Sequence, residues 1–235
     1  MSGLYFFLDG FRLIRKPALR RYFVMPTIIN ALILLGLLIV GYLNFGNWVS
    51  NIVGLFPDWV LTLYWLIWAM LFVVALFSLA LFFNFIANII SAPFNALLSV
   101  KVEEYLTKKP LTAQVSVWPM LLRAIGREIR KLLYVLPRFA ILVLITFIPG
   151  VNFVAPILWI IFGAWMMAVQ YTDYGADNNN VSFVDLKDRL QQRRFQALLF
   201  GLPAYLLLTI PGVNFVLMPI GVAGGTKFWV ERLKH

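Results

Sequence analysis

Residues 60–90 read VLTLYWLIWAMLFVVALFSLALFFNFIANII, a run without a single Lys, Arg, Asp or Glu. A second uncharged run, residues 22–45, reads YFVMPTIINALILLGLLIVGYLNF. Roughly 20 helical residues are enough to cross the hydrocarbon core of a bilayer. Because a backbone in lipid has to satisfy its own hydrogen bonds, we expect both runs to be membrane-spanning helices. The two runs therefore predict an all-α integral membrane protein.

The bulk composition agrees with this class. Of 235 residues, 62% are hydrophobic and 13% are charged, whereas a soluble domain is nearer half apolar and a quarter charged. We therefore expect one membrane domain, residues 1–235. The chain contains no cysteine and a single histidine, His235, which argues against thiol chemistry, metal sites and His-based catalysis. No nucleotide-binding glycine loop is present either, so we expect neither an enzyme nor a cofactor.

The basic residues are distributed unevenly along the chain. All 20 Lys and Arg lie outside residues 22–100, and five of them fall in a basic N-terminal arm, residues 1–21. The connection between the two runs has no basic residue and one acid, Asp58. The positive-inside rule then places the arm, the segment after Ile90 and the C-terminus in the cytoplasm. The net charge of +10 is explained by topology and by contact with anionic membrane lipid, so we expect no nucleic-acid partner.

The second half of the chain contains an internal repeat. The heptapeptide IPGVNFV occupies residues 148–154 and again residues 210–216. Pro-Gly followed by Asn ends a helix and turns the chain, so each copy predicts a turn between two apolar helices. The candidate tip residues are Pro149, Gly150 and Asn152 in the first copy and Pro211, Gly212 and Asn214 in the second.

The arms around these turns are short. From Arg138 to Pro149 is about 16 Å of helix, and from Arg194 to Pro211 about 25 Å, against the roughly 30 Å of a full span. We expect two re-entrant hairpins, residues 132–171 and 195–229, that enter from the cytoplasm, turn within the bilayer and return. The alternative is four ordinary spans with tight outer turns.

Residues 99–131, between the halves, are expected to form a cytoplasmic helical segment. Arg123, Arg127 and Arg130 recur there at i, i+4 and i+7, which places them on one face of a helix. They could line an anion pathway, paired in part with Glu103. Arg138 lies in an apolar stretch beside Pro137, where an ionisable residue is a functional candidate, although snorkelling to the interface explains it equally well.

The sequence at the start of the first apolar run is PALRRY, residues 17–22. Pro favours the first turn of a helix, whose free amides attract an anion. Arg20 and Arg21 add forked donors that suit a tetrahedral oxyanion. Two arginines at a cytoplasmic helix start are more often topology markers, so this pattern alone does not establish a site.

The chain resembles the CysZ family of bacterial inner-membrane sulfate permeases over most of its length. Residues 17–22 are similar to that family's P-G-L-R-R-F stretch, where sulfate binds. The segment APFN at 92–95, with Leu97, Leu98, Lys101, Val102 and Glu103, resembles A-P-F-N-x-L-L-x-x-K-x-E. The segment QYTDY at 170–174, with Asp177 and Asn178, resembles Q-Y-x-D-Y-x-x-D-N.

The resemblance implies sulfate uptake that supplies cysteine synthesis, two long membrane helices with two partly penetrating hairpins, and a homo-oligomer, with a hexamer expected. It places the sulfate contacts on Ala18, Leu19, Arg20 and Arg21. Ala18 stands where the motif has Gly, which costs little if the backbone there is an ordinary helix start. The alternative function is a non-transport scaffold or lipid-interacting protein that uses its basic cytoplasmic face.

Overall fold

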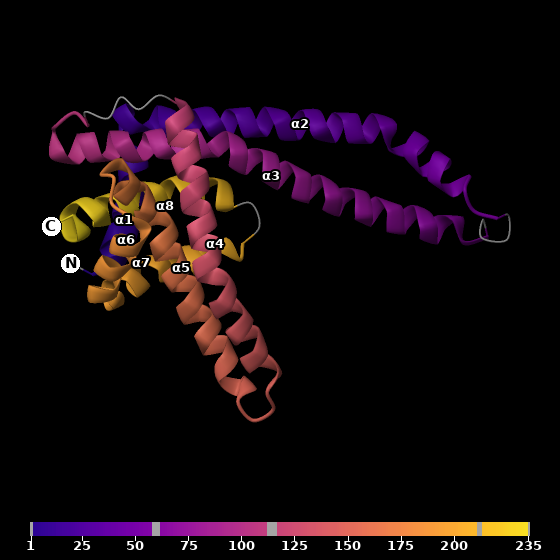
Figure 1. Cartoon of the computed structure of the whole chain (residues 1–235). Coiled ribbons are helices and arrows are strands. Elements are labelled where there is room, and N and C mark those ends of the chain that lie inside the picture. Colours follow the sequence, from indigo (N-terminus) through magenta and orange to yellow (C-terminus); the bar gives the residue numbers. More distant parts are fainter. Residues whose placement is uncertain (1, 58–61, 112–116, 211–212, 235) are drawn as a thin grey trace. The chain divides into compact units, whose positions relative to one another are not determined.

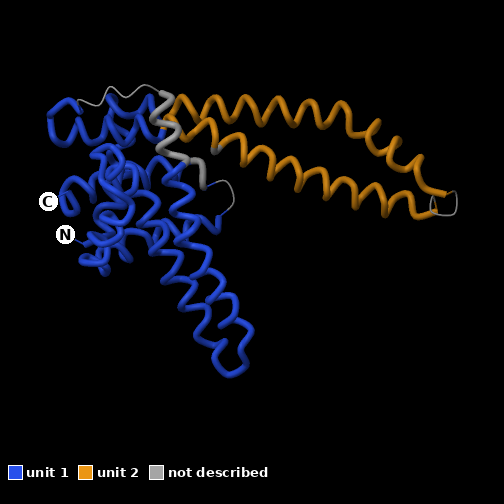
Figure 2. Tube along the Cα trace, in the orientation of Figure 1, with its two compact units in different colours: residues 1–23, 95–235 blue, residues 24–94 orange. Residues whose placement is uncertain are grey.

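A computed structural model describes residues 2–57, 62–111, 117–210 and 213–234. Within these ranges, the side chains of residues 88, 117–125, 214 and 215 are not described. Every regular element among the described residues is a helix (Figure 1). The chain divides into two compact units (Figure 2). Unit 1 comprises Met1–Phe23 and Asn95–His235, and unit 2 comprises Val24–Phe94.

Unit 2 contains the C-terminal part of α2 (Pro17–Val53) and the N-terminal part of α3 (Tyr64–Thr107). At 37 and 44 residues they are about 55 and 66 Å long, so each can cross a bilayer and extend beyond it. Both are apolar enough to do so. Residues 22–45 lie within α2 and residues 64–90 within α3, so the predicted runs are helical there and continue beyond the predicted ends. Val60 lies outside the described residues.

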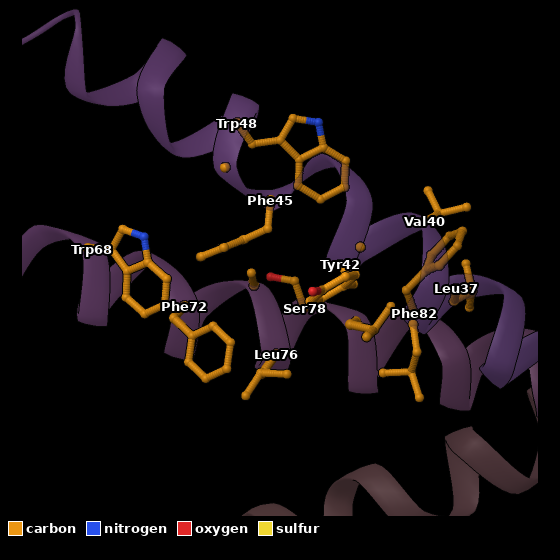
Figure 3. A pocket seen from close by; sticks show the side chains of 15 residues that line it. Leu37, Val40, Tyr42, Phe45, Trp48, Trp68, Phe72, Leu76, Ser78 and Phe82 are labelled. Carbon is orange, nitrogen blue, oxygen red and sulfur yellow. The ribbon is translucent and has the colours of Figure 1, made fainter.

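The pair of helices in unit 2 is held by one polar and several aromatic contacts. Asn30 Nδ2 donates to Ser91 Oγ at 3.0 Å. Farther along, the Phe45 ring lies edge-on to Trp68, with ring centroids 5.3 Å apart. Between the helices a groove of about 810 Å³ is lined by apolar and aromatic side chains such as Trp48 and Phe72 (Figure 3). Its lining residues include no charged side chain, so the groove does not suit an anion.

Unit 1 holds the remaining helices. They are α1 (Gly3–Ile14), α4 (Val117–Phe147), the short 3-10 turn η2 (Asn152–Val154), α5 (Ala155–Asn178), α6 (Phe183–Gln192), α7 (Arg194–Leu208), α8 (Asn214–Phe228) and the π-helical end η3 (Trp229–Leu233). Helices α1, α5, α7 and α8 pack together to form the core. The largest buried side chains there include Phe6, Phe200 and Trp229.

The basic N-terminal arm contains an ordered amphipathic helix, α1. Its apolar side buries Phe6, Phe7, Leu13 and Ile14 in the core of unit 1. Asp9 also lies on this side, where its carboxylate pairs with Lys227 of α8. Burial alone would raise the pKa of Asp9, but the bonds from Lys227 and Tyr5 outweigh it and hold that pKa below its usual value. The pair is therefore ionised at neutral pH and joins the first helix to the last.

Glycines allow the core helices of unit 1 to approach closely. A Cβ on Gly201 of α7 would lie 1.8 Å from the Ala164 carbonyl oxygen of α5. A Cβ on Gly225 of α8 would lie 2.5 Å from the Tyr171 carbonyl oxygen, also on α5. Small residues of this kind are typical of helix packing in membranes, where close backbone approach replaces the hydrophobic effect as the source of stability.

The two predicted hairpins are present as helix pairs, α4–α5 and α7–α8. The first turns at Gly150, whose φ of 81° lies in the left-handed region that Gly tolerates best. Pro149 and Asn152 are exposed beside it. In the second hairpin Asn214 begins α8, whereas Pro211 and Gly212 lie outside the described residues. Of residues 99–131, residues 99–107 form the end of α3 and residues 117–131 the start of α4. The described residues between them, 108–111, are not helical, so the prediction of one helical segment is wrong there.

The close approach at Gly201 is tested by Gly201→Ala. We expect a loss of about 1–3 kcal/mol of stability, because the new methyl group meets backbone that cannot yield. The readout is the temperature at which the purified protein leaves its monodisperse peak in size-exclusion chromatography. The control is Gly126→Ala in α4, whose Cβ would meet nothing within 4 Å. It should be neutral or slightly stabilising, since Ala favours a helix over Gly. Equal loss in both variants would contradict the packing account.

Candidate anion-binding site

The start of α2 forms the first candidate anion site. Helix α2 begins at Pro17, and the amides of Leu19 and Arg20 both donate to the Lys16 carbonyl, at 2.9 and 2.8 Å. Pro has no amide hydrogen, and the first-turn amides of a helix have no intrahelical partner. The Ala18 amide is therefore the remaining first-turn donor at this helix start.

The side chains at this site divide between the core and the surface of unit 1. Leu19 is 1% exposed and belongs to the core, whereas Ala18, Arg20 and Arg21 are exposed. Arg21 Nη2 donates to the Tyr22 hydroxyl at 2.8 Å, and its guanidinium carbon lies 4.8 Å from the centre of that ring. Within the described ranges, neither arginine is paired with a carboxylate. The buried Leu19 thus anchors a turn that presents two guanidinium groups to the solvent.

Ala18 occupies an ordinary helical backbone position. Among the described residues, the only non-glycine positions with positive φ are Lys108 and Asn180. The prediction that Ala can replace Gly in this motif without backbone strain is therefore confirmed.

Glu103 lies near the end of α3 and is completely buried in unit 1. Its Oε1 accepts from Asn179 Nδ2 at 2.9 Å and from Lys234 Nζ at 2.8 Å. The sequence pattern suggested pairing with the arginines of residues 123–130. The structure instead pairs Glu103 with the C-terminal end of the chain, which is too far away in sequence for local spacing to reveal.

Arg127 is the centre of a buried ion cluster that joins α4 to α5. Its guanidinium forms an ion pair with Asp173, approaches Asp177 at 3.6 Å and donates to the Val181 carbonyl at 2.8 Å. Lys131, one turn along α4, lies 3.2 Å from Asp173 as well. The cations and carboxylates largely neutralise one another, which is what allows charged groups to be buried here.

The other basic candidates are in different surroundings. Arg130 is exposed, so it does not share the buried environment of Arg127, and the side chain of Arg123 lies outside the described residues. Arg138 is exposed farther along α4 and stacks on Tyr134, with its guanidinium carbon 3.7 Å from the ring centre. The sequence interpretation missed Asp173 and Lys131 as members of the cluster. The sequence signal that could have identified Asp173 is the QYTDY segment at 170–174.

The ion cluster predicts a strong effect of Arg127→Gln. Removing the arginine leaves the buried Asp173 with Lys131 as its remaining cation, and the half-buried Asp177 without its partner, which should cost about 3–5 kcal/mol of stability. The readout is the thermal midpoint of the purified protein. The control Arg130→Gln removes the same charge from an exposed position and should change stability by less than about 0.5 kcal/mol.

A second variant separates pairing from packing. Asp173→Asn in the Arg127→Gln background should cost less than the sum of the two single changes, because the partners share one interaction. Additive costs would show that the cluster does not stabilise the fold through pairing.

The fold and these sites define an all-helical integral membrane protein. Among the described residues, three helices are long and apolar enough to cross the bilayer, and one of them begins with two exposed arginines that have no carboxylate partner there. The family model described as sulfate transporter CysZ/Etoposide-induced protein 2.4 matches residues 6–219. The chain belongs to this family, which is a family of transporters and not of enzymes.

Relatives from several bacteria are similar over almost the full chain. A sulfate transporter CysZ from Pseudomonas paraeruginosa is 41% identical, over 99% of this chain and 96% of its own length. The protein of the same name from Vibrio parahaemolyticus is 37% identical, over 100% and 96%. The one from Pectobacterium atrosepticum is 36% identical, over 100% and 86%.

Proposed function

We propose that this protein transports sulfate across the bacterial inner membrane. The observation that carries the proposal is near-full-length similarity to proteins named sulfate transporter, together with an exposed arginine pair at the start of a spanning helix. Sulfate delivered in this way would supply cysteine synthesis. The apolar runs 22–45 and 60–90 contain none of the acidic residues that proton- and sodium-coupled carriers usually keep at membrane depth, so we propose a channel-like conduit.

The capture step follows from the geometry at residues 17–22. A sulfate ion has oxygens that can accept from the Ala18 amide and from the forked donors of Arg20 and Arg21 at once. Charge-assisted bonds of this kind are roughly twice as strong as neutral ones. The aligned peptides of α2 add partial positive charge at the same end. Leu19 contributes by anchoring the turn in the core, so that the donors are positioned before the ion arrives.

The path beyond this site is proposed to run over the basic residues of α4. Arg130 is the exposed member and can attract an anion directly, and Arg123 lies two turns earlier on the same helix. Arg127 is neutralised by its acidic partners and Glu103 is buried, so neither suits direct contact with an anion. We assign them a positioning role, in which Arg127 holds α4 and Glu103 holds the end of α3 beside the path. Arg138 lies about 16 Å along the helix from Arg127, which separates it from this group.

The proposed topology has α2 and α3 as full spans and the two hairpins as re-entrant elements. Helices α7 and α8 have 15 residues each, about 22 Å, which is short of a full span. In the first hairpin α4 has 31 residues, but its uncharged arm from Arg138 to the tip is still about 16 Å. Helix α5 together with η2 is long and apolar enough to span, which is the observation that favours the four-span alternative for this hairpin.

The tight packing of α7 and α8 against α1 and α5 supports the re-entrant arrangement. A turn within the bilayer is tolerated only where protein shields its backbone. We further propose cytoplasmic termini, from the positive-inside rule, and a homo-oligomer, with a hexamer expected from the family resemblance. Much of the apolar surface of α2 and α3 is exposed in the single chain, where lipid or other subunits can cover it.

The topology is tested by single cysteines, since the native chain has none. We expect Phe153→Cys, at the exposed tip of the first hairpin, to resist a membrane-impermeant maleimide added outside intact cells. Leu55→Cys, in the connection between α2 and α3, should react from outside. Lys109→Cys should react only after the cells are opened. Labelling of Phe153→Cys from outside, at the rate of Leu55→Cys, would establish a full span instead.

The function is tested by sulfate flux into proteoliposomes. We expect uptake of labelled sulfate by the native chain, and loss of both sulfate binding and uptake in the variant with Arg20→Ala and Arg21→Ala. The reason is that the variant removes the charged donors and retains Leu19 as the anchor. No flux above empty liposomes for a folded native chain would refute transport.

A matched variant controls for simple loss of charge. Arg15→Ala with Lys16→Ala removes two exposed cations from the same segment and leaves the first turn of α2 intact. Its sulfate affinity should fall far less, because neither side chain is one of the proposed sulfate contacts. An equal loss of sulfate affinity in the two double variants would mean that the total positive charge of the segment attracts sulfate and that residues 17–22 form no specific site. The alternative function, a lipid-interacting scaffold, predicts lipid binding without any anion flux.

A further inference from the structure

Unit 1 contains a groove beside the first hairpin that has no role in the transport proposed above. It lies among α4, α5 and the α6–α7 region and has a volume of about 590 Å³, which is within the usual range for ligand pockets. Its lining includes the polar side chains of Arg138, Arg194 and Tyr134. It also includes apolar side chains such as Ile141 and Phe162. The lining of the groove therefore combines two cations with apolar surface.

The two arginines of the groove keep their charge available. In the part of the chain that the structure describes, neither Arg138 nor Arg194 forms an ion pair with a carboxylate, whereas the buried Arg127 has two acidic partners. Their surroundings supply aromatic faces in place of acids. Arg138 stacks on Tyr134, and the Arg194 guanidinium carbon lies 5.5 Å from the centre of the Phe195 ring. An anion bound here would meet two uncompensated positive charges.

Arg138 is held in position by a chain of contacts. Its Nη1 donates to the Tyr134 carbonyl at 2.7 Å, and its guanidinium group lies against the Tyr134 ring. The Tyr134 hydroxyl in turn accepts from Trp165 Nε1 of α5 at 3.0 Å. Because the ring between them is fixed from both helices, the arginine loses less side-chain freedom when it binds a ligand.

The apolar part of the groove indicates whether its ligand is a free oxyanion or an anion that carries a hydrocarbon chain. Ile141 is 57% exposed and Ile161 is 47% exposed, so the floor is open to a hydrocarbon chain. A free oxyanion would use the arginines and leave this floor unoccupied. Counted along the helices, Arg138 is about 18 Å from the Gly150 tip and Arg194 about 24 Å from the Ile210 turn, so both lie toward the same membrane surface.

We propose that this groove binds an anionic phospholipid. The phosphate diester lies between Arg138 and Arg194, and an acyl chain lies along Ile141, Ile161 and Phe162. Basic pockets between membrane helices on the cytoplasmic side recognise anionic headgroups in this way. The site is separate from residues 17–22, and its occupation does not depend on which ion the protein transports.

The first experiment measures lipid binding to the detergent-purified full-length chain by native mass spectrometry. We expect dioctanoyl phosphatidylglycerol to bind more tightly than dioctanoyl phosphatidylcholine. Arg138→Gln with Arg194→Gln should weaken phosphatidylglycerol binding about thirtyfold and abolish the preference between the two lipids. The matched control, Arg130→Gln with Arg193→Gln, removes the same charge from neighbouring exposed positions and should retain both. Unchanged phosphatidylglycerol binding in the groove variant would overturn the proposal.

Competition identifies the source of the anion. Neither sulfate nor glycerol phosphate at the lipid's concentration should displace phosphatidylglycerol, because both lack the acyl chain. Displacement by either would overturn the lipid assignment in favour of a free-oxyanion site.

A second measurement places the acyl chain without relying on the arginine variants. Brominated phosphatidylglycerol should quench the fluorescence of Trp165, so Trp165→Phe should lose a quenched component that the control Trp159→Phe keeps. Equal quenching in both variants would overturn occupation of the groove by the acyl chain.

Discussion

The close backbone approach of four helices in unit 1 is the constraint on which the rest of the arrangement depends. Gly201 and Gly225 let α7 and α8 lie against α5 with no side chain between them, and α1 closes the other side. This core supports the buried ion cluster of Arg127, the buried carboxylate of Glu103 and the anchor of Leu19. Without it, the turn that presents Arg20 and Arg21 would have no fixed position, because Leu19 is buried in this core and Tyr22 packs against it.

Much of the fold could be predicted from the sequence, because the membrane imposes its rules locally. Uncharged runs of sufficient length predicted α2 and α3, and the IPGVNFV repeat predicted two turns, of which the structure describes Gly150 in the left-handed conformation. The candidate site was equally local, since PALRRY is contiguous. Predictions failed where partners are distant in sequence. Glu103 pairs with Lys234 and Arg127 with Asp173, and no spacing rule connects such positions. The buried face of α1 was not predicted, because the basic residues of this arm were interpreted only as signals of membrane orientation.

Charge has three separate uses in this chain. On the surface of residues 12–21, basic side chains are proposed to set the membrane orientation, and two of them are proposed to capture sulfate. In the interior of unit 1, cations and carboxylates neutralise one another, which favours a defined packing geometry over anion attraction. At the groove lined by α4, α5, α6 and α7, two arginines without acidic partners among the described residues lie beside apolar side chains, a combination that suits an amphiphile. The immediate environment, and not the number of basic residues, distinguishes the three.

The Asp9–Lys227 pair has a consequence for biosynthesis. The two residues are 218 positions apart, so α1 is made first and its main partner last. At about 5–20 residues per second, synthesis of the intervening chain takes roughly 11–44 s. Throughout that interval Asp9 and the apolar side of α1 lack their native neighbours, while α2 and α3 are already available for insertion into lipid. The core of unit 1 can close only when the C-terminal helix emerges from the ribosome, so a nascent chain stopped early is left with an incomplete core that quality-control proteases can recognise.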